Sequence, residues 1–135
     1  MPPTMHPLLW NHVPNAPAPG AVLGALSDLA DGQALMRVWD GGTPEPADKP
    51  FRYLLARSGS TVHAYVNRCA HFGVPLAQKQ ENLLFVPHTS ITCNVHYARY
   101  DWKDGHCLGG ECEGVGLLPI PVALDAQGLI RIATP

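Results

Sequence analysis

The chain has 135 residues, a length that suits a single domain, and hydrophobic residues make up 46% of it, enough to build a core. Its formal charge of −2 and the lack of any basic stripe in the sequence argue against a nucleic-acid partner. The 13 glycines and 14 prolines exceed ordinary usage and favour a loop-rich, mostly β domain over a helical bundle.

The N-terminal segment is rich in proline and carries no recognisable targeting signal. Residues 1–24 are therefore predicted to form an extended arm, and residues 25–135 the folded domain. The first basic residue is Arg37, and no apolar stretch approaches the ~20 residues that span a bilayer. We expect a cytoplasmic protein without a membrane span, in which paired Cys and His indicate a metal before a disulfide.

The first half of the chain predicts three strands. Ala34–Trp39 is one, and Asp40–Pro50, with its glycines and prolines, is a loop. Phe51–Ala56 and Thr61–Val66 form the clearest hairpin, joined by a turn at residues 57–60. In the second strand of this hairpin small apolar residues recur at every other position, which is the period of a β-strand.

The second half predicts four more strands and no helix. They are Leu83–Val86, Ser90–Thr92, Ile120–Leu124 and Leu129–Ala133, with a closing hairpin across residues 125–128. The predicted fold class is all-β.

Two cysteine–histidine pairs carry the chemistry of the sequence. Cys69 and His71 directly follow the second strand of the hairpin, and Cys93 and His96 directly follow the strand at Ser90–Thr92. Two such loops lying side by side would present four ligands to one centre. Thiolates suit iron–sulfur cores and imidazole also suits iron. Because neutral imidazoles replace two thiolates, such a cluster accepts an electron more readily than an all-thiolate one.

The pattern resembles that of the Rieske iron–sulfur proteins, and among them the small soluble Rieske ferredoxins. The family has C-x-H with a glycine two residues after the histidine, and then C-x-x-H. The matching segments are Cys69-Ala70-His71-Phe72-Gly73, Cys93-Asn94-Val95-His96, Tyr100-Asp101, Gly105, Leu118 to Val122 and Gly128 to Ile132. The likeness runs from about Leu26 to Ala133.

The resemblance implies a Rieske-type β-sandwich with a small cluster-binding subdomain at one end. It implies one [2Fe–2S] cluster per chain as the cofactor. Cys69 and Cys93 would bind the inner iron, while His71 and His96 would bind the outer iron near the surface where electrons enter and leave.

The chain departs from the family pattern at several positions. Twenty-one residues separate His71 from Cys93, several more than usual, and we place the extra length in Gln78–Ser90. Tyr97 stands where the family usually has glycine, and we expect it to shield the cluster or touch a partner. Ala98 replaces a serine that donates a hydrogen bond in high-potential members, which predicts a potential in the lower part of the Rieske range.

Simpler interpretations of the same residues remain open. The four ligands suit tetrahedral zinc as well, although zinc fingers usually group their two cysteines and then their two histidines. Cys107 and Cys112 are interpreted as incidental thiols in a glycine-rich loop, with extra ligands or a redox pair as the alternative. His63 is expected to be a solvated strand histidine.

The favoured function is a one-electron carrier, not an enzyme, that takes electrons from a reductase and delivers them to a terminal oxygenase or similar acceptor. A catalytic oxygenase fragment is less favoured, because Rieske oxygenases need a second domain with a mononuclear iron. A tightly bound small subunit of a larger reductase or oxidase and a structural zinc module are the remaining alternatives.

Overall fold

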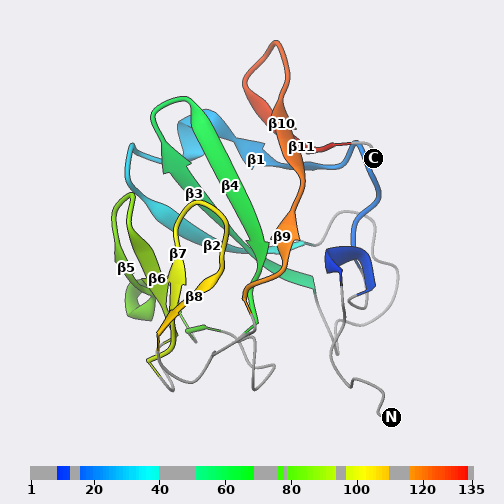
Figure 1. The fold of residues 1–135 in the computed structure, drawn as a ribbon. Coiled ribbons are helices and arrows are strands. Elements are labelled where there is room, and N and C mark those ends of the chain that lie inside the picture. The colour runs from blue at the N-terminus through cyan, green and yellow to red at the C-terminus, as the bar shows by residue number, and fades with distance from the viewer. Residues whose placement is uncertain are drawn as a thin grey trace.

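The structure is a computed structural model that describes residues 9–12, 16–39, 51–68, 76–77, 79–93, 97–109 and 116–133. Eleven strands in three antiparallel sheets form the described part, with three short 3₁₀ turns (Figure 1). The strands are β1 (Val22–Ala25), β2 (Ala34–Trp39), β3 (Phe51–Ser58), β4 (Thr61–Val66), β5 (Leu84–Val86), β6 (Ser90–Thr92), β7 (Arg99–Asp101), β8 (Cys107–Gly109), β9 (Pro119–Ile120), β10 (Val122–Leu124) and β11 (Leu129–Ile132). The 3₁₀ turns are η1 (Trp10–His12), η2 (Leu26–Asp28) and η3 (Gln80–Asn82).

The sheet β2-β3-β4-β9 lies in the middle and buries both of its faces. Along β3, Tyr53 and Leu55 pack toward β1, β10 and β11, whereas Leu54 and Ala56 pack toward the sheet β5-β6-β7-β8. A strand with two buried faces needs a nearly continuous apolar run, and the central residues of β3 supply one. Two core layers therefore share one sheet.

The central hairpin of the sequence prediction is confirmed, with one extension. β3 continues to Ser58 and pairs with β4 from Tyr53↔Val66 to Ser58↔Thr61, so the connection is only Gly59 and Ser60. The predicted strand Ile120–Leu124 is instead two short strands on either side of Pro121. Because proline has no N–H to donate to a ladder, the chain changes there from pairing with β4 to pairing with β11.

Three observed strands were not predicted. β1 pairs with β11 and crosses residue 24, where the arm was expected to end. β7 and β8 pair with each other beside β6. The loop predicted over Asp40–Pro50 lies outside the described residues.

Side chains hold the sheet β5-β6-β7-β8 against the central sheet. The Gln80 amide accepts from the Met36 N–H (2.6 Å) and donates to the Ala34 carbonyl (2.9 Å), so it occupies the open edge of β2. The buried indole N–H of Trp102 donates to Ser58 Oγ (2.9 Å), which lies 2.7 Å from His88 Nδ1. The extra segment expected between the ligand loops thus contributes η3 and β5, and η3 bridges two sheets.

No helical segment in the described part of the chain has the length and hydrophobicity needed to cross a bilayer.

Candidate metal centre

The structure describes one of the four predicted ligands and the bases of both ligand loops. Cys93 is described, whereas Cys69, His71 and His96 lie outside the described residues. The residues that flank the two pairs are therefore the observations that bear on a metal centre.

The base of the first loop is closed by a buried asparagine. Asn67, 3% exposed, directly follows β4, and its side-chain oxygen accepts from the Leu76 N–H at 2.8 Å. The Asn67 N–H donates to the Arg52 carbonyl at 2.9 Å, which fixes the asparagine to β3. The ends of the segment that contains Cys69 and His71 are thereby held together. We did not predict this role from the sequence, although a polar residue at the buried end of a strand was a usable signal.

The second loop is closed by its own backbone. The Cys93 N–H donates to the Ala98 carbonyl and the Tyr97 N–H donates to the Cys93 carbonyl, both at 2.8 Å. Tyr97 has a φ of 60°, in the left-handed region that non-glycine residues rarely adopt. Tyr97 and Ala98, which directly follow the segment that contains His96, are therefore both tied to Cys93.

The two loop bases meet in one core layer. Leu76, Cys93 and Ala98 are each 0% exposed and belong to the same cluster of buried residues, with Tyr100 and Trp102. The Cys93 thiol is not part of a disulfide. A buried cysteine sulfur beside the closed ends of a second Cys–His loop fits the mixed thiolate and imidazole donor set of a Rieske cluster.

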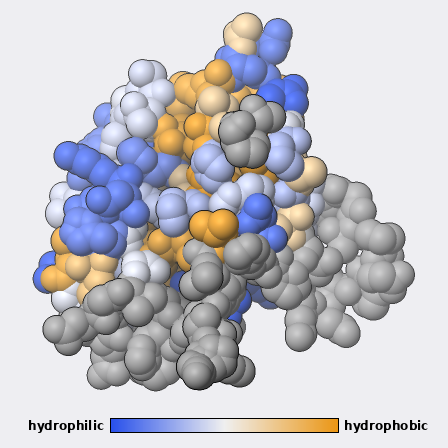
Figure 2. All heavy atoms as spheres, turned by 45° about the vertical axis from the view of Figure 1, so that its right-hand side comes forward, coloured by the Kyte–Doolittle hydropathy of each residue, from blue (hydrophilic) through white to orange (hydrophobic). Residues whose placement is uncertain are grey.

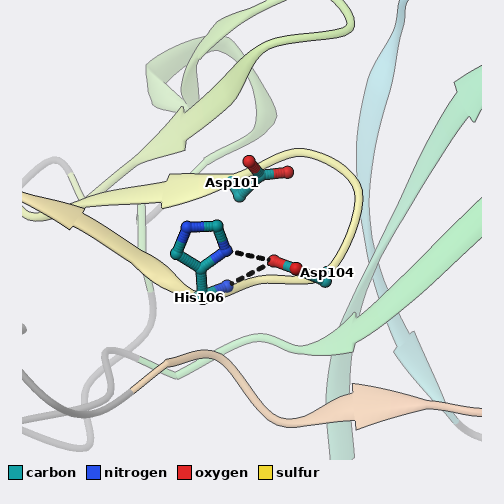
Figure 3. A group of neighbouring side chains, drawn as sticks. All are labelled: Asp101, Asp104 and His106. Carbon is teal, nitrogen blue, oxygen red and sulfur yellow. Dashed lines mark hydrogen bonds and ion pairs between the residues drawn. The ribbon is translucent and has the colours of Figure 1, made fainter.

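A second group of candidate metal ligands lies in the β7–β8 turn. Ligand atoms of Asp101, Asp104 and His106 lie within 4.8 Å of one another (Figure 3). Asp104 Oδ1 accepts from the His106 N–H (2.9 Å) and lies 2.6 Å from His106 Nδ1. Hydrogen bonds from His106 lower the pKa of Asp104, and the Asp104 carboxylate raises the pKa of His106. Asp104 and His106 therefore satisfy each other, and Asp101 accepts from the Lys103 N–H at 2.7 Å within the same turn.

His63 differs from its expected role as a solvated histidine. Its side chain is only partly exposed, and desolvation by burial lowers its pKa. The neighbouring Tyr65 is buried and donates its hydroxyl to the Trp102 carbonyl at 2.7 Å, and burial raises its pKa. The face of β4 that carries both residues is covered by the β7–β8 turn, which sequence alternation alone did not reveal.

Cys107 is not an incidental thiol, as we expected, but is disulfide-bonded. It lies on β8, partly buried, opposite Tyr100 of β7. Its predicted neighbour in the loop, Cys112, lies outside the described residues.

An open groove of about 240 Å³ lies between β4 and β10. Its lining comes from Ser60, Thr61, Val62, Val122, Ala123, Leu124 and Ile130. Figure 2 shows hydrophobic side chains gathered on this face below the projecting β10–β11 hairpin. The groove lies at the start of β4, whereas the first ligand loop follows the end of that strand.

Comparison with protein families gives one match over most of the chain. The family model described as the Rieske [2Fe-2S] domain matches residues 21–121. A search of curated proteins found no match.

Solved structures share the fold. The ferredoxin of carbazole 1,9a-dioxygenase from Nocardioides aromaticivorans IC177 is similar with a TM-score of 0.61 and 19% identity, over 87% of this chain and 100% of that one. The Sphingomonas yanoikuyae B1 ferredoxin gives a TM-score of 0.62 and 19% identity, over 86% and 99%. A chain in the complex of reduced oxygenase and oxidized ferredoxin in carbazole 1,9a-dioxygenase gives 0.61 and 19%, over 84% and 91%.

Proposed function

Because this chain belongs to the Rieske [2Fe–2S] domain family, we propose that Cys69, His71, Cys93 and His96 hold one [2Fe–2S] cluster and that the protein carries single electrons. The observation that carries the proposal is the meeting of the two ligand-loop bases in one core layer around buried Cys93. The cluster, when bound, supplies the one-electron chemistry.

The chain's own residues position the ligands and seal the inner side of the site. Cys93 and the predicted ligand Cys69 would hold the iron that faces the core, where Leu76 and Ala98 exclude water. His71 and His96 would hold the outer iron. Asn67 keeps the first loop closed, and the backbone of Cys93, Tyr97 and Ala98 keeps the second loop closed.

The partners that suit this role are a reductase as donor and a terminal oxygenase as acceptor. Two proteins with this fold are named as ferredoxins, and a third structure is a complex of a ferredoxin with an oxygenase. This chain spans the whole length of the first of these ferredoxins. These likenesses support a carrier that shuttles between two redox proteins, and we propose that it does so in the cytoplasm.

A redox titration followed by EPR tests the carrier role. We expect the EPR signal to follow a single reversible one-electron transition. Its midpoint reduction potential should lie in the lower part of the range of roughly −150 to +300 mV that Rieske clusters cover. The physical reason is that Ala98, which is buried beside Cys93, has no side-chain donor for a cluster sulfur. A protein that binds zinc, or iron that does not cycle, would contradict electron transfer.

A further inference from the structure

The β7–β8 turn gathers metal-ligating side chains that electron transfer does not use. Asp101 ends β7, Asp104 and His106 follow in the turn, and their ligand atoms lie within 4.8 Å of one another (Figure 3). Two carboxylates and one imidazole make a mixed oxygen and nitrogen donor set, which suits zinc and similar transition-metal cations. All three side chains are at least partly exposed, so a cation can reach them from solvent.

Each of the two carboxylates uses one oxygen within the turn and leaves the other available. Asp101 Oδ1 accepts from the Lys103 N–H at 2.7 Å, and Asp104 Oδ1 lies 2.6 Å from His106 Nδ1. Within the described residues, no hydrogen bond to Oδ2 of either carboxylate is found. The backbone of the turn therefore orients both carboxylates before a cation binds.

A buried hydroxyl beside this group lacks a partner. Ser90 is 2% exposed, and no hydrogen bond to its Oγ is found among the residues that the structure describes. Ser90 lies opposite Asp101 in the β6–β7 ladder, so the two side chains share one face of the sheet. The Trp102 N–H donates to the Thr89 carbonyl, which makes Ser90↔Asp101 a non-hydrogen-bonded pair, the kind in which side chains lie closest. The Ser90 hydroxyl is therefore directed toward the Asp101 side chain.

The electrostatics of the turn favour a positive charge. The hydrogen bond from Asp104, and then the charges of Asp104 and Asp101, raise the pKa of His106. A divalent cation would take the place of the proton that His106 shares with Asp104, and that proton would leave to solvent. Lys103, in the same turn, has a charge that opposes binding, so Lys103→Gln should bind the cation more tightly.

We propose that Asp101, Asp104 and His106 bind one divalent cation of the zinc class, and that the Ser90 hydroxyl positions the Asp101 carboxylate. Water completes the four-coordinate shell that zinc prefers. The buried Ser90 hydroxyl then has the charged partner that it otherwise lacks. The site is separate from the proposed cluster, because Asp101 ends β7 whereas the contact with Cys93 is made by Ala98, before that strand begins.

Zinc titration of the protein as purified, with its cluster, tests the site. Metal that is already bound is measured first, so that only the added zinc is counted. We expect one saturable zinc ion per chain and a shift of the His106 ring signals in NMR spectra. Calcium, which takes oxygen ligands, should bind far more weakly. The proposal is overturned by a chain without saturable zinc binding, or by calcium binding that is as tight as that of zinc.

Ligand variants locate the bound zinc. Asp104→Asn and His106→Gln should each weaken zinc binding at least about tenfold, because each removes a ligand. The matched control is Asp31→Asn, since Asp31 lies 3.6 Å from His88 in another exposed Asp–His pair, one that has no third ligand nearby within the described residues. The control should bind zinc like the parent. Equal affinities in the parent and both ligand variants, or an equal loss in Asp31→Asn, would rule out this site.

Ser90→Ala tests the positioning role. The variant should weaken zinc binding several-fold without lowering Tm in the absence of zinc, because the hydroxyl that it removes has no partner there. The iron content should equal that of the parent, which shows that the fold is intact. A Ser90→Ala variant that lowers Tm and leaves zinc binding unchanged would show that Ser90 serves only the fold.

Discussion

Tyr97, directly after the predicted ligand His96, is held in a backbone conformation that tyrosine disfavours. Tyr97 adopts a φ of 60°, which costs a residue with a Cβ roughly 1–2 kcal/mol, and its side chain is 65% exposed. No hydrogen bond to the Tyr97 side chain is found within the described residues, so no side-chain hydrogen bond offsets this conformational cost. A backbone hydrogen bond offsets the cost, because the Tyr97 N–H donates to the Cys93 carbonyl.

Replacing Tyr97 separates the cost of the conformation from the loss of the ring. Tyr97→Gly and Tyr97→Ala both remove the ring, but only glycine adopts positive φ freely. We expect Tyr97→Gly to have the higher free energy of unfolding, by about 1 kcal/mol, in urea denaturation. An alanine variant that equals or exceeds the glycine variant would show that this turn is not held in the left-handed region.

Asn67 is the residue whose loss should open the first ligand loop. In Asn67→Ala the Leu76 N–H, 2.8 Å from the asparagine oxygen, keeps no side-chain acceptor in a buried position. We expect a loss of about 1–3 kcal/mol in the free energy of unfolding, together with faster release of iron. Thr61→Ala, at the exposed other end of β4, is the matched control and should change neither quantity. Equal stability of the two variants would contradict the bridging role of Asn67.

At the scale of elements, the β7–β8 turn carries an ion pair that titrates. The pair of protonated His106 and ionised Asp104 stabilises the folded state where both are charged. Since the pKa of His106 is raised from 6.5, its contribution is complete below pH 6.5 and disappears as the pH rises through the folded-state pKa. Since the pKa of Asp104 is lowered from 3.8, its contribution is present above that pH and disappears on further acidification.

An NMR titration of the His106 ring measures this coupling. We expect a pKa above 6.5 in the parent protein, and a fall in Asp104→Asn because the hydrogen-bonding carboxylate is lost. Asp101→Asn is the control, since Asp101 acts on His106 only through a weaker charge interaction, and it should change the pKa less. If Asp101→Asn has the larger effect, the hydrogen bond in Figure 3 is not the cause of the raised pKa.

The strands also show which parts of the fold local sequence patterns predict and which parts they miss. Turn residues and period-two alternation located the β3–β4 and β10–β11 hairpins, because both signals are local. The same alternation was wrong about the polar face of β4, since that face is covered by the β7–β8 turn, which is distant in sequence. β7 and β8 are three residues each, and strands this short give too few positions for a period.

At the scale of the molecule, the central sheet is shared by two core layers, and the sheet that leads into Cys93 is attached to it through Gln80, Ser58 and Trp102. The sequence predicts the four ligands from their types, which suit an iron–sulfur cluster, and from their spacing, which resembles that of the Rieske proteins. The contacts of Asn67 and Gln80 could not be predicted, because they depend on the fold: Asn67 accepts from Leu76, nine residues away, and Gln80 from Met36, 44 residues away. The disulfide at Cys107 was equally invisible, since a pairing depends on distances in the fold.

The most direct test of the central claim is the iron and acid-labile sulfide content of the anaerobically purified protein, with EPR spectra before and after dithionite reduction. We expect about two irons and two sulfides per chain, as a [2Fe–2S] cluster requires, and a Rieske-type signal only after reduction. Cys69→Ser, His71→Ala, Cys93→Ser and His96→Ala should each abolish that signal, whereas Cys107→Ser should keep it. Zinc without sulfide, or a cluster that survives the loss of any one proposed ligand unchanged, would contradict the account.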